Sequence, residues 1–155
     1  MIIRPATSKD EEQVFRLARA LATSFAVRRE AFSSSFGEAL ASQSYEVIVA
    51  EDETRLVGYV FGLHHHAFYA NGLVSWVEEI FVEEASRRKG IGEQLMRAFE
   101  HRACERGSRL VALATRRAAS FYAAIGYEES ATYFRKLLQE AEPESAANGG
   151  QSRRC

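Results

Sequence analysis

Apolar residues near the start of the chain first follow an extended pattern and then recur at helical spacing. The β-branched run at residues 1–6 predicts a strand. A helix is expected next, because Ser8 and Glu11 form the pattern of a capping box. Its apolar face comprises Val14, Leu17, Ala18 and Leu21. Residues 28–42 predict a second, weaker helix interrupted by the segment SSSFG, and residues 22–36 lack a clean period and are expected to be mobile.

The middle of the chain predicts three successive strands. Residues 45–50 and 56–63 are extended apolar runs that the polar turn EDETR joins into a hairpin. Residues 64–72 form a histidine-rich and aromatic loop that closes with Asn71-Gly72, a dipeptide typical of tight turns. Residues 73–82 complete the series as a third strand.

The last part of the chain predicts alternating helices and strands. Residues 90–106 form a long amphipathic helix that Gly107 ends. A short buried strand at 110–114 and a short helix at 117–125 follow, and residues 127–138 predict a terminal strand. The order indicates a mixed α/β domain at residues 1–138, antiparallel in front and with a βαβ unit behind.

Composition narrows the class of protein. A length of 155 residues fits one domain. A net charge of -1 gives no support for a nucleic-acid or membrane partner. The chain shows neither a signal-peptide pattern nor an apolar run of the ~20 residues that a membrane span needs. Two cysteines, Cys104 and Cys155, form no disulfide framework, so a reducing, cytoplasmic location is expected. Residues 139–155 lack the large apolar side chains that could stabilise an ordered structure, and they predict a disordered tail.

A basic, glycine-containing segment predicts an anion site between the third strand and the long helix. It reads Arg87-Arg88-Lys89-Gly90-Ile91-Gly92. The first turn of a helix presents unpaired N–H groups and the positive end of the helix dipole, and glycines let a phosphate approach the backbone. The expected ligand carries a pyrophosphate-like group, and the alternative is a solvated basic turn. Neither of two commoner phosphate-loop patterns, GxxxxGK[ST] and GxGxxG after a strand, is present.

Two segments resemble the GNAT superfamily of N-acetyltransferases. Arg87-x-x-Gly90-x-Gly92 is similar to the R/Q-x-x-G-x-G/A motif of that family, and residues 118–127 resemble its A-x-x-F-Y-x-x-x-G-F/Y block. The resemblance covers roughly residues 1 to 138. Glu84 stands where the family commonly has a proline. Thr115 stands where the family often has an asparagine, and this second difference leaves the cofactor contacts of the second block less defined.

The resemblance implies a fold and a donor. The fold is a mixed, mostly antiparallel sheet of about six or seven strands flanked by about four helices, with the central strands splayed apart. Acetyl-CoA, the donor co-substrate, lies in the splay, where the backbone of Ile80, Phe81 and Val82 pairs with its pantetheine arm. The pyrophosphate lies against Arg87, Arg88, Lys89, Gly90, Ile91, Gly92 and Glu93. No metal is required, and many relatives are homodimers, so a homodimer is expected here.

The resemblance also suggests the catalytic groups of a direct attack by an amine on the thioester. Glu78 aligns with the base of polyamine-type relatives, and its pKa would rise if it were partly buried in the cleft. Glu79 is adjacent, so it points to the opposite face. Tyr122 matches the family's general acid. The structural alternatives are a solvated pair of glutamates and a tyrosine that packs on the sheet.

The acceptor side is less defined. Adjacent His64, His65 and His66 alternate in direction, which makes them poor ligands of one metal ion. The residues expected to contact the acceptor are Phe25, His64, His66, Trp76 and Glu79. Clustered glutamates favour a cationic small molecule or a peptide amine, although a charged sheet rim has the same pattern. An acyl-CoA-binding sensor without turnover is a second hypothesis. A nucleic-acid module that uses the segment SRRKG and Arg116-Arg117 is disfavoured by the charge.

Overall fold

A single five-stranded sheet organises residues 1–138, the part of the chain that the computed structural model describes. The predicted tail at 139–155 lies outside the described residues. The strands lie in sequence order: β1 (Ile2–Pro5), β2 (Tyr45–Asp52), β3 (Arg55–Ala67), β4 (Gly72–Val82) and β5 (Val111–Leu113). Neighbours pair antiparallel except β4 and β5, which are parallel. The sequence prediction of an antiparallel front and a βαβ unit behind is therefore confirmed.

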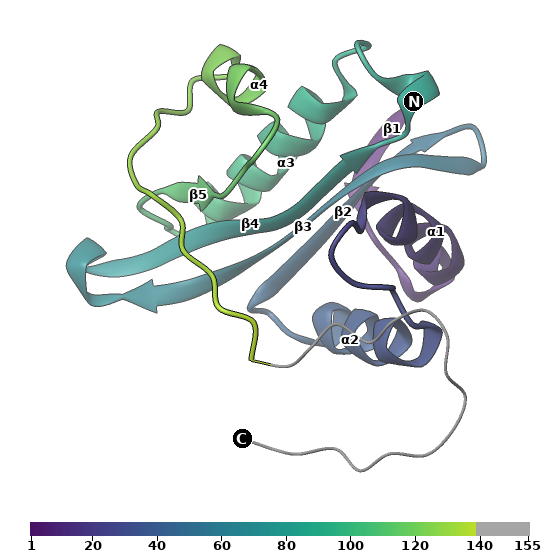
Figure 1. Cartoon of the computed structure of the whole chain (residues 1–155), viewed down its shortest axis with the longest axis horizontal. Coiled ribbons are helices and arrows are strands. Elements are labelled where there is room, and N and C mark those ends of the chain that lie inside the picture. The colour runs from purple at the N-terminus through teal and green to yellow at the C-terminus, as the bar shows by residue number, and fades with distance from the viewer. Residues whose placement is uncertain (139–155) are drawn as a thin grey trace.

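Helices cover both faces of the sheet (Figure 1). One face carries α1 (Glu11–Leu21) and α2 (Arg29–Ala41), and the other carries α3 (Ile91–Glu105) and α4 (Ala119–Ala124). Short 3-10 turns occur at Ser8–Asp10, Phe68–Ala70 and Glu84–Ser86. The four α-helices of the described residues agree with the expected number. No helix within residues 1–138 has the length and apolarity needed to cross a membrane.

Alternation along the central strands builds a core on each side of the sheet. In β2, Ile48 and Ala50 join the cluster under α3, whereas Val47 and Val49 join the cluster under α1 and α2. Phe99 of α3 is fully buried in the first cluster and Leu17 of α1 in the second. Burial on both faces explains why β2 is an apolar run in the sequence.

The strand count is lower than the resemblance implied. Residues 127–138, expected to be a terminal strand, form neither helix nor strand. Tyr133, Phe134, Leu137 and Leu138 in this segment are exposed. In Figure 1 the segment leaves α4 and crosses towards α2, and an Arg135 Nη1–Ser24 Oγ contact of 3.5 Å links it to the α1–α2 connection. The neighbouring strand β5 is only three residues long, so its edge offers little backbone for a further strand.

Several element boundaries also differ from the predictions. His64, His65 and His66 belong to β3 rather than to a loop, because they pair with Ser75, Val74 and Leu73 of β4. Helix α2 runs without interruption through SSSFG, so residues 29–36 are helical.

The capping interaction before α1 is one residue earlier than predicted. The N–H and hydroxyl of Thr7 donate to Asp10 at 2.7 and 2.9 Å. Arg4 adds two further bonds to the same carboxylate, and its guanidinium holds the pKa of Asp10 down at about 2. The predicted turns at Asn71, Gly107 and Gly126 are confirmed by positive φ angles of 54°, 78° and 95°.

Candidate functional site

Strand β4 has an open edge where β5 ends. The ladder between β4 and β5 covers Ser75 to Val77, whereas β4 continues to Val82. On the other side, β3 pairs with β4 through Val82. Within the described residues the last part of β4 therefore has a strand neighbour on one side only, at the position where the resemblance implied a splay. An extended ligand can add to such an edge as an extra strand.

The alternation of the ladder defines which backbone groups face this edge. Glu83 N–H donates to Val57 O at 2.9 Å, so odd-numbered residues at this end of β4 turn towards β3. Ile80 and Val82 accordingly turn their N–H and C=O groups outwards, where a pantetheine arm was expected. Phe81 turns its backbone towards β3, and its carbonyl oxygen would lie 2.7 Å from a Cβ placed on Gly58.

The basic segment after β4 forms a bent loop that opens onto α3. Arg88 and Gly90 both have left-handed conformations, with φ of 60° and 75°, and α3 begins at Ile91. The N–H groups of Ile91, Gly92 and Glu93 lie in the first helical turn, where an α-helix provides no carbonyl partner. They are therefore placed to bind an anion, together with the positive end of the helix dipole.

The basic side chains of this loop differ in whether they are free to bind a ligand. Arg88 and Lys89 are exposed. Arg87 is already engaged, because its Nε donates to Val82 O at 2.9 Å and its guanidinium lies 5.7 Å from the Phe81 ring centre. Its role in the structure is to tie the loop to the end of β4. Glu93 forms an ion pair with Arg97 at 2.6 Å, which offsets its negative charge beside the expected anion.

Helix α4 packs against the start of α3 and brings the two family-like segments together. A Cβ on Gly92 would lie 3.3 Å from Cζ of Phe121, so the ring rests almost on the glycine backbone. The adjacent Tyr122 ring lies 5.0 Å from that of Phe121, at an interplanar angle of 69°. Tyr122 is buried among Ile91, Leu95 and Met96, and burial raises its pKa above the usual value. The phenol therefore keeps its proton and can act as a donor.

The two adjacent glutamates of β4 have different surroundings. The ladder has a bulge here, since Phe61 pairs with Glu79 and Gly62 with Val77, which leaves Glu78 as the extra residue. Glu78 is exposed, whereas Glu79 is half-buried. The partial burial expected for Glu78 is thus found at Glu79.

Tyr59, which sequence reasoning missed, is the partner of Glu79. Its hydroxyl donates to Glu79 Oε2 at 2.6 Å. The pKa of Glu79 is raised, mainly by burial and further by Glu78, and the bond from Tyr59 opposes this rise. Tyr59 gave no sequence signal of its own, because it sits within an apolar strand whose residues all read as core.

The residues expected to contact the acceptor have different surroundings in the structure. His64 is only 5% exposed and stacks on Phe99 with ring centres 5.5 Å apart, so its side chain lies in the core rather than at the surface. His66 is exposed near the end of the β3–β4 hairpin, and Trp76 is half-buried in β4. Phe25, in the α1–α2 connection, does line a hollow of about 500 Å³.

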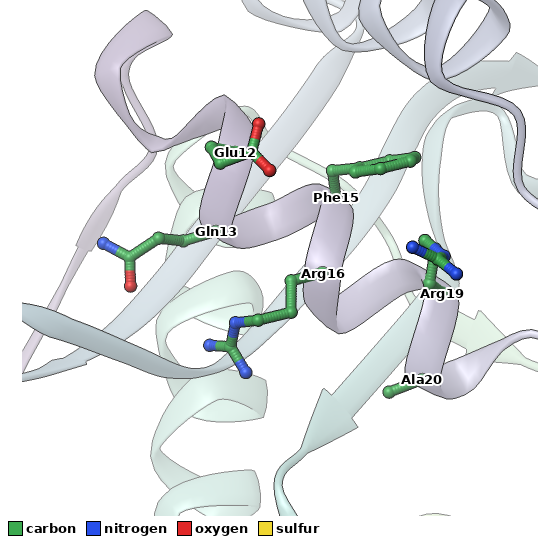
Figure 2. A pocket seen from close by; sticks show the side chains of 6 residues that line it. All are labelled: Glu12, Gln13, Phe15, Arg16, Arg19 and Ala20. Carbon is green, nitrogen blue, oxygen red and sulfur yellow. The ribbon is translucent and has the colours of Figure 1, made fainter.

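Two adjoining hollows flank α1. The α1 hollow, about 420 Å³, is lined by Glu12, Gln13, Phe15, Arg16, Arg19 and Ala20 (Figure 2). The second hollow, called here the loop hollow, is lined by residues 22–27, which include Phe25. Phe15 and Arg19 line both hollows. The Arg19 guanidinium lies 5.7 Å from the Phe15 ring centre. Arg16 is instead paired with Glu83 of the β4 end, which places α1 beside the open strand.

A Ser–His–Glu arrangement elsewhere in the sheet is structural. His64 Nδ1 and Ser75 Oγ share a hydrogen bond of 2.7 Å, and His64 Nε2 lies 4.0 Å from Glu46 Oε2. Ser75 is 1% exposed and its hydroxyl also bonds to Ser108, so a substrate has no access to it. Within residues 1–138, no cluster of three or more His, Cys, Asp or Glu side chains is arranged to hold a metal ion.

Comparison with known families assigns the class of protein. A model described as an acetyltransferase (GNAT) domain matches residues 43–129, which include β4, the basic loop, α3 and α4. The match covers more than half of the 155 residues. The chain belongs to the GNAT acetyltransferase family. A search of curated proteins found no matching sequence.

Solved structures share the fold over nearly the whole described chain. AAC(6')-Iy in complex with the bisubstrate analog CoA-S-monomethyl-acetylneamine is 23% identical, with a TM-score of 0.75 over 88% of this chain and 98% of that one. Glucosamine-6-phosphate N-acetyltransferase from Arabidopsis thaliana is 20% identical, with a TM-score of 0.79 over 89% and 98%. A transcriptional regulator from Bacillus halodurans C-125 is 26% identical, with a TM-score of 0.79 over 88% and 99%.

Proposed function

We propose that the protein is an acetyl-CoA-dependent N-acetyltransferase that acts on a primary amine. The observation that carries the proposal is the packing of Phe121 on Gly92, which joins both family segments beside the open edge of β4. The outward backbone groups of Ile80 and Val82 bind the pantetheine arm. The first-turn N–H groups of α3 bind the pyrophosphate, and Arg88 and Lys89 add positive charge.

The reaction follows from the groups around the edge. The nitrogen of a neutral amine attacks the thioester carbonyl, a C–N bond forms, and collapse of the tetrahedral intermediate breaks the C–S bond. Tyr122 donates a proton to the departing thiolate, and a carboxylate of β4 accepts the proton of the amine. The strand offers Glu78, the candidate from the sequence, and Glu79. Both carboxyl groups lie beside the bulge, where a carboxylate would favour a cationic acceptor.

The acceptor is proposed to be a small molecule, with a peptide amine as the other possibility. Neighbours of the same fold are named for an aminoglycoside and for glucosamine-6-phosphate. The hollows beside α1 have volumes of about 420 and 500 Å³ on this chain, and Phe25 lines the loop hollow. A cytoplasmic location remains part of the proposal because of the two cysteines, and a homodimer remains part of it on the family resemblance alone.

A second candidate is an acyl-CoA-binding sensor without turnover. It is favoured by the likeness to the chain described as a transcriptional regulator, which is 26% identical. Such a sensor needs the same donor site and no proton transfer. The Tyr122 hydroxyl and the β4 carboxylates favour the enzyme, since binding alone does not require them.

A thiol-release assay separates the two candidates. Acetyl-CoA is incubated with the protein and a panel of polyamines, aminoglycosides, amino sugars, amino acids and peptides. Amine-dependent thiol release supports the enzyme. A rise in melting temperature with acetyl-CoA, without release for any amine, supports the sensor, because a ligand that binds only the native state stabilises it. The absence of both effects would sink both candidates.

A further inference from the structure

We infer that Glu79 is the carboxylate that accepts the proton of the amine and that Tyr59 is its positioning residue. The inference rests on the proposed function, since it assigns the base of that reaction. It departs from the choice of Glu78 that the family resemblance suggested. Four features of the described residues support it: the bulge, the burial, the hydrogen bond and the side of the sheet.

The bulge places Glu79 at the point where β4 and β5 separate. Pairing with β5 ends at Val77, and the outward backbone groups begin at Ile80. Glu79 lies between these two positions. A carboxylate there is next to the start of the open edge, where the thioester end of an extended ligand would lie.

Successive side chains at the end of β4 point to opposite faces of the sheet, and this separates the proposed donor side of the site from the proposed acceptor side. Ile80 and Val82 pack with the cluster under α3, whereas Phe81 packs with the cluster under α1 and α2. By alternation Glu79 shares the side of Phe81, and its bond to Tyr59, a member of the second cluster, agrees. An acceptor that approaches from the side of α1 therefore meets Glu79.

Tyr59 fixes the carboxylate without blocking it. Tyr59 is 1% exposed, and its ring is held in the cluster by Val14, Leu17 and Ala18 of α1. Burial, reinforced by Glu79, raises the pKa of Tyr59, so the phenol keeps its proton and donates. The bond occupies Oε2 and leaves Oε1 as the oxygen that can accept a proton from the amine.

The titration of Glu79 depends on a short list of groups. Burial raises its pKa, the bond from Tyr59 of β3 lowers it, and Glu78 of β4 raises it. Val14, Leu17 and Ala18 of α1, which share the buried cluster with Tyr59, are apolar. Removal of the Tyr59 hydroxyl should therefore move the pKa of Glu79 upwards, which gives the inference a signature that a purely structural role for Tyr59 would not produce.

The test uses full-length E79Q, E78Q and Y59F, with Y45F as the matched tyrosine control. The pH–rate profile is recorded by thiol release with the best amine of the panel. We expect E79Q to lower kcat by about 100-fold or more and to remove the acidic limb of the profile, in line with typical general-base effects. E78Q should keep that limb. Y59F should shift it to higher pH with the KM for acetyl-CoA unchanged, and Y45F should not shift it.

The inference would be overturned if E78Q lost the acidic limb of the profile while E79Q kept it. It would also be overturned if Y59F left that limb at the wild-type pH. Stabilisation by acetyl-CoA in each variant shows that folding and donor binding survive. Carbon NMR titration of Glu79 in the wild type and Y59F measures the coupling without turnover, and equal pKa values would refute the positioning role. A wild type that binds acetyl-CoA and acetylates no amine would instead refute the proposed function, whatever the titration shows.

Discussion

The ring of Phe121 lies against the backbone of Gly92, so closely that a Cβ on that glycine would be 3.3 Å from Cζ. Gly92 belongs to the first turn of α3, and Phe121 belongs to α4, next to Tyr122. One contact therefore connects the anion-binding turn with the proposed general acid. It brings residues far apart in the chain into one proposed site.

Replacement of Gly92 by alanine is predicted to weaken acetyl-CoA binding by about tenfold without stabilising the fold. An alanine in a helix ordinarily gains about 1 kcal/mol over glycine, but here Phe121 has to move. Gly37 of α2 is the matched control, because a Cβ there meets no atom within 4 Å. Urea unfolding and calorimetric titration measure both quantities. If G92A were as stabilising as G37A and bound acetyl-CoA normally, the contact would have no functional role.

Neutralising Arg88 and Lys89 is predicted to lower affinity for acetyl-CoA and to reduce its dependence on salt. Both side chains are exposed, so their attraction to a pyrophosphate is screened by ions. The double variant R88Q/K89Q should keep the wild-type melting temperature in the absence of ligand. R135Q/K136Q removes the same charge elsewhere and should bind normally. Equal losses in the two double variants would point to a general effect of net charge.

Replacement of Tyr122 by phenylalanine is predicted to reduce turnover by about 100-fold while acetyl-CoA binds as before. The change removes one hydroxyl from a buried ring and leaves the packing on Phe121 intact. Burial raises the pKa of Tyr122, so its deprotonation should not limit the rate near neutral pH. The exposed Tyr133 provides the control variant Y133F. Unchanged turnover in Y122F would remove this residue from the mechanism.

Acid is predicted to destabilise the fold through His64. Burial is the main cause that lowers the pKa of His64, and the positive charges of Arg106 and, to a smaller extent, Arg102 lower it further. The negative charge of Glu46 partly opposes this lowering. The unfolded chain therefore binds a proton more readily than the native state, and stability present above the unfolded pKa is lost as the pH falls. The loss from this group begins as the pH falls through the unfolded pKa, which is near 6.5.

Urea unfolding at several pH values checks the assignment to His64. The variant H64N should lose less stability than the wild type as the pH falls, and H65N, at an exposed position of the same strand, should behave as the wild type does. An identical pH dependence in H64N and the wild type would assign the acid sensitivity to another group.

Much of the fold could be predicted because its signals are local. The apolar runs around Val49 and Val60 read as strands, and the amphipathic stripe of α3 ends where Gly107 adopts its left-handed conformation. The basic loop could be placed because Gly90 and Gly92 meet conformational and steric demands that few other residues satisfy.

The rest depends on relationships between strands that the sequence pattern does not show. The bulge beside Gly62 decides which of Glu78 and Glu79 is buried, and it exists only in the pairing of β3 with β4. His64 looked like a loop residue, yet its bond to Ser75 and its stacking on Phe99 place it in the core. The terminal segment had a strand-like composition, but strand formation needs a partner edge, and β5 is short.

Backbone amide NMR during titration with acetyl-CoA tests the donor site most directly. The account predicts saturable shifts at the amides of Ile80, Val82, Ile91, Gly92 and Glu93, with smaller changes in the outer part of the β3–β4 hairpin. Shifts confined to that hairpin, or no shifts at acetyl-CoA concentrations in the millimolar range, would contradict it.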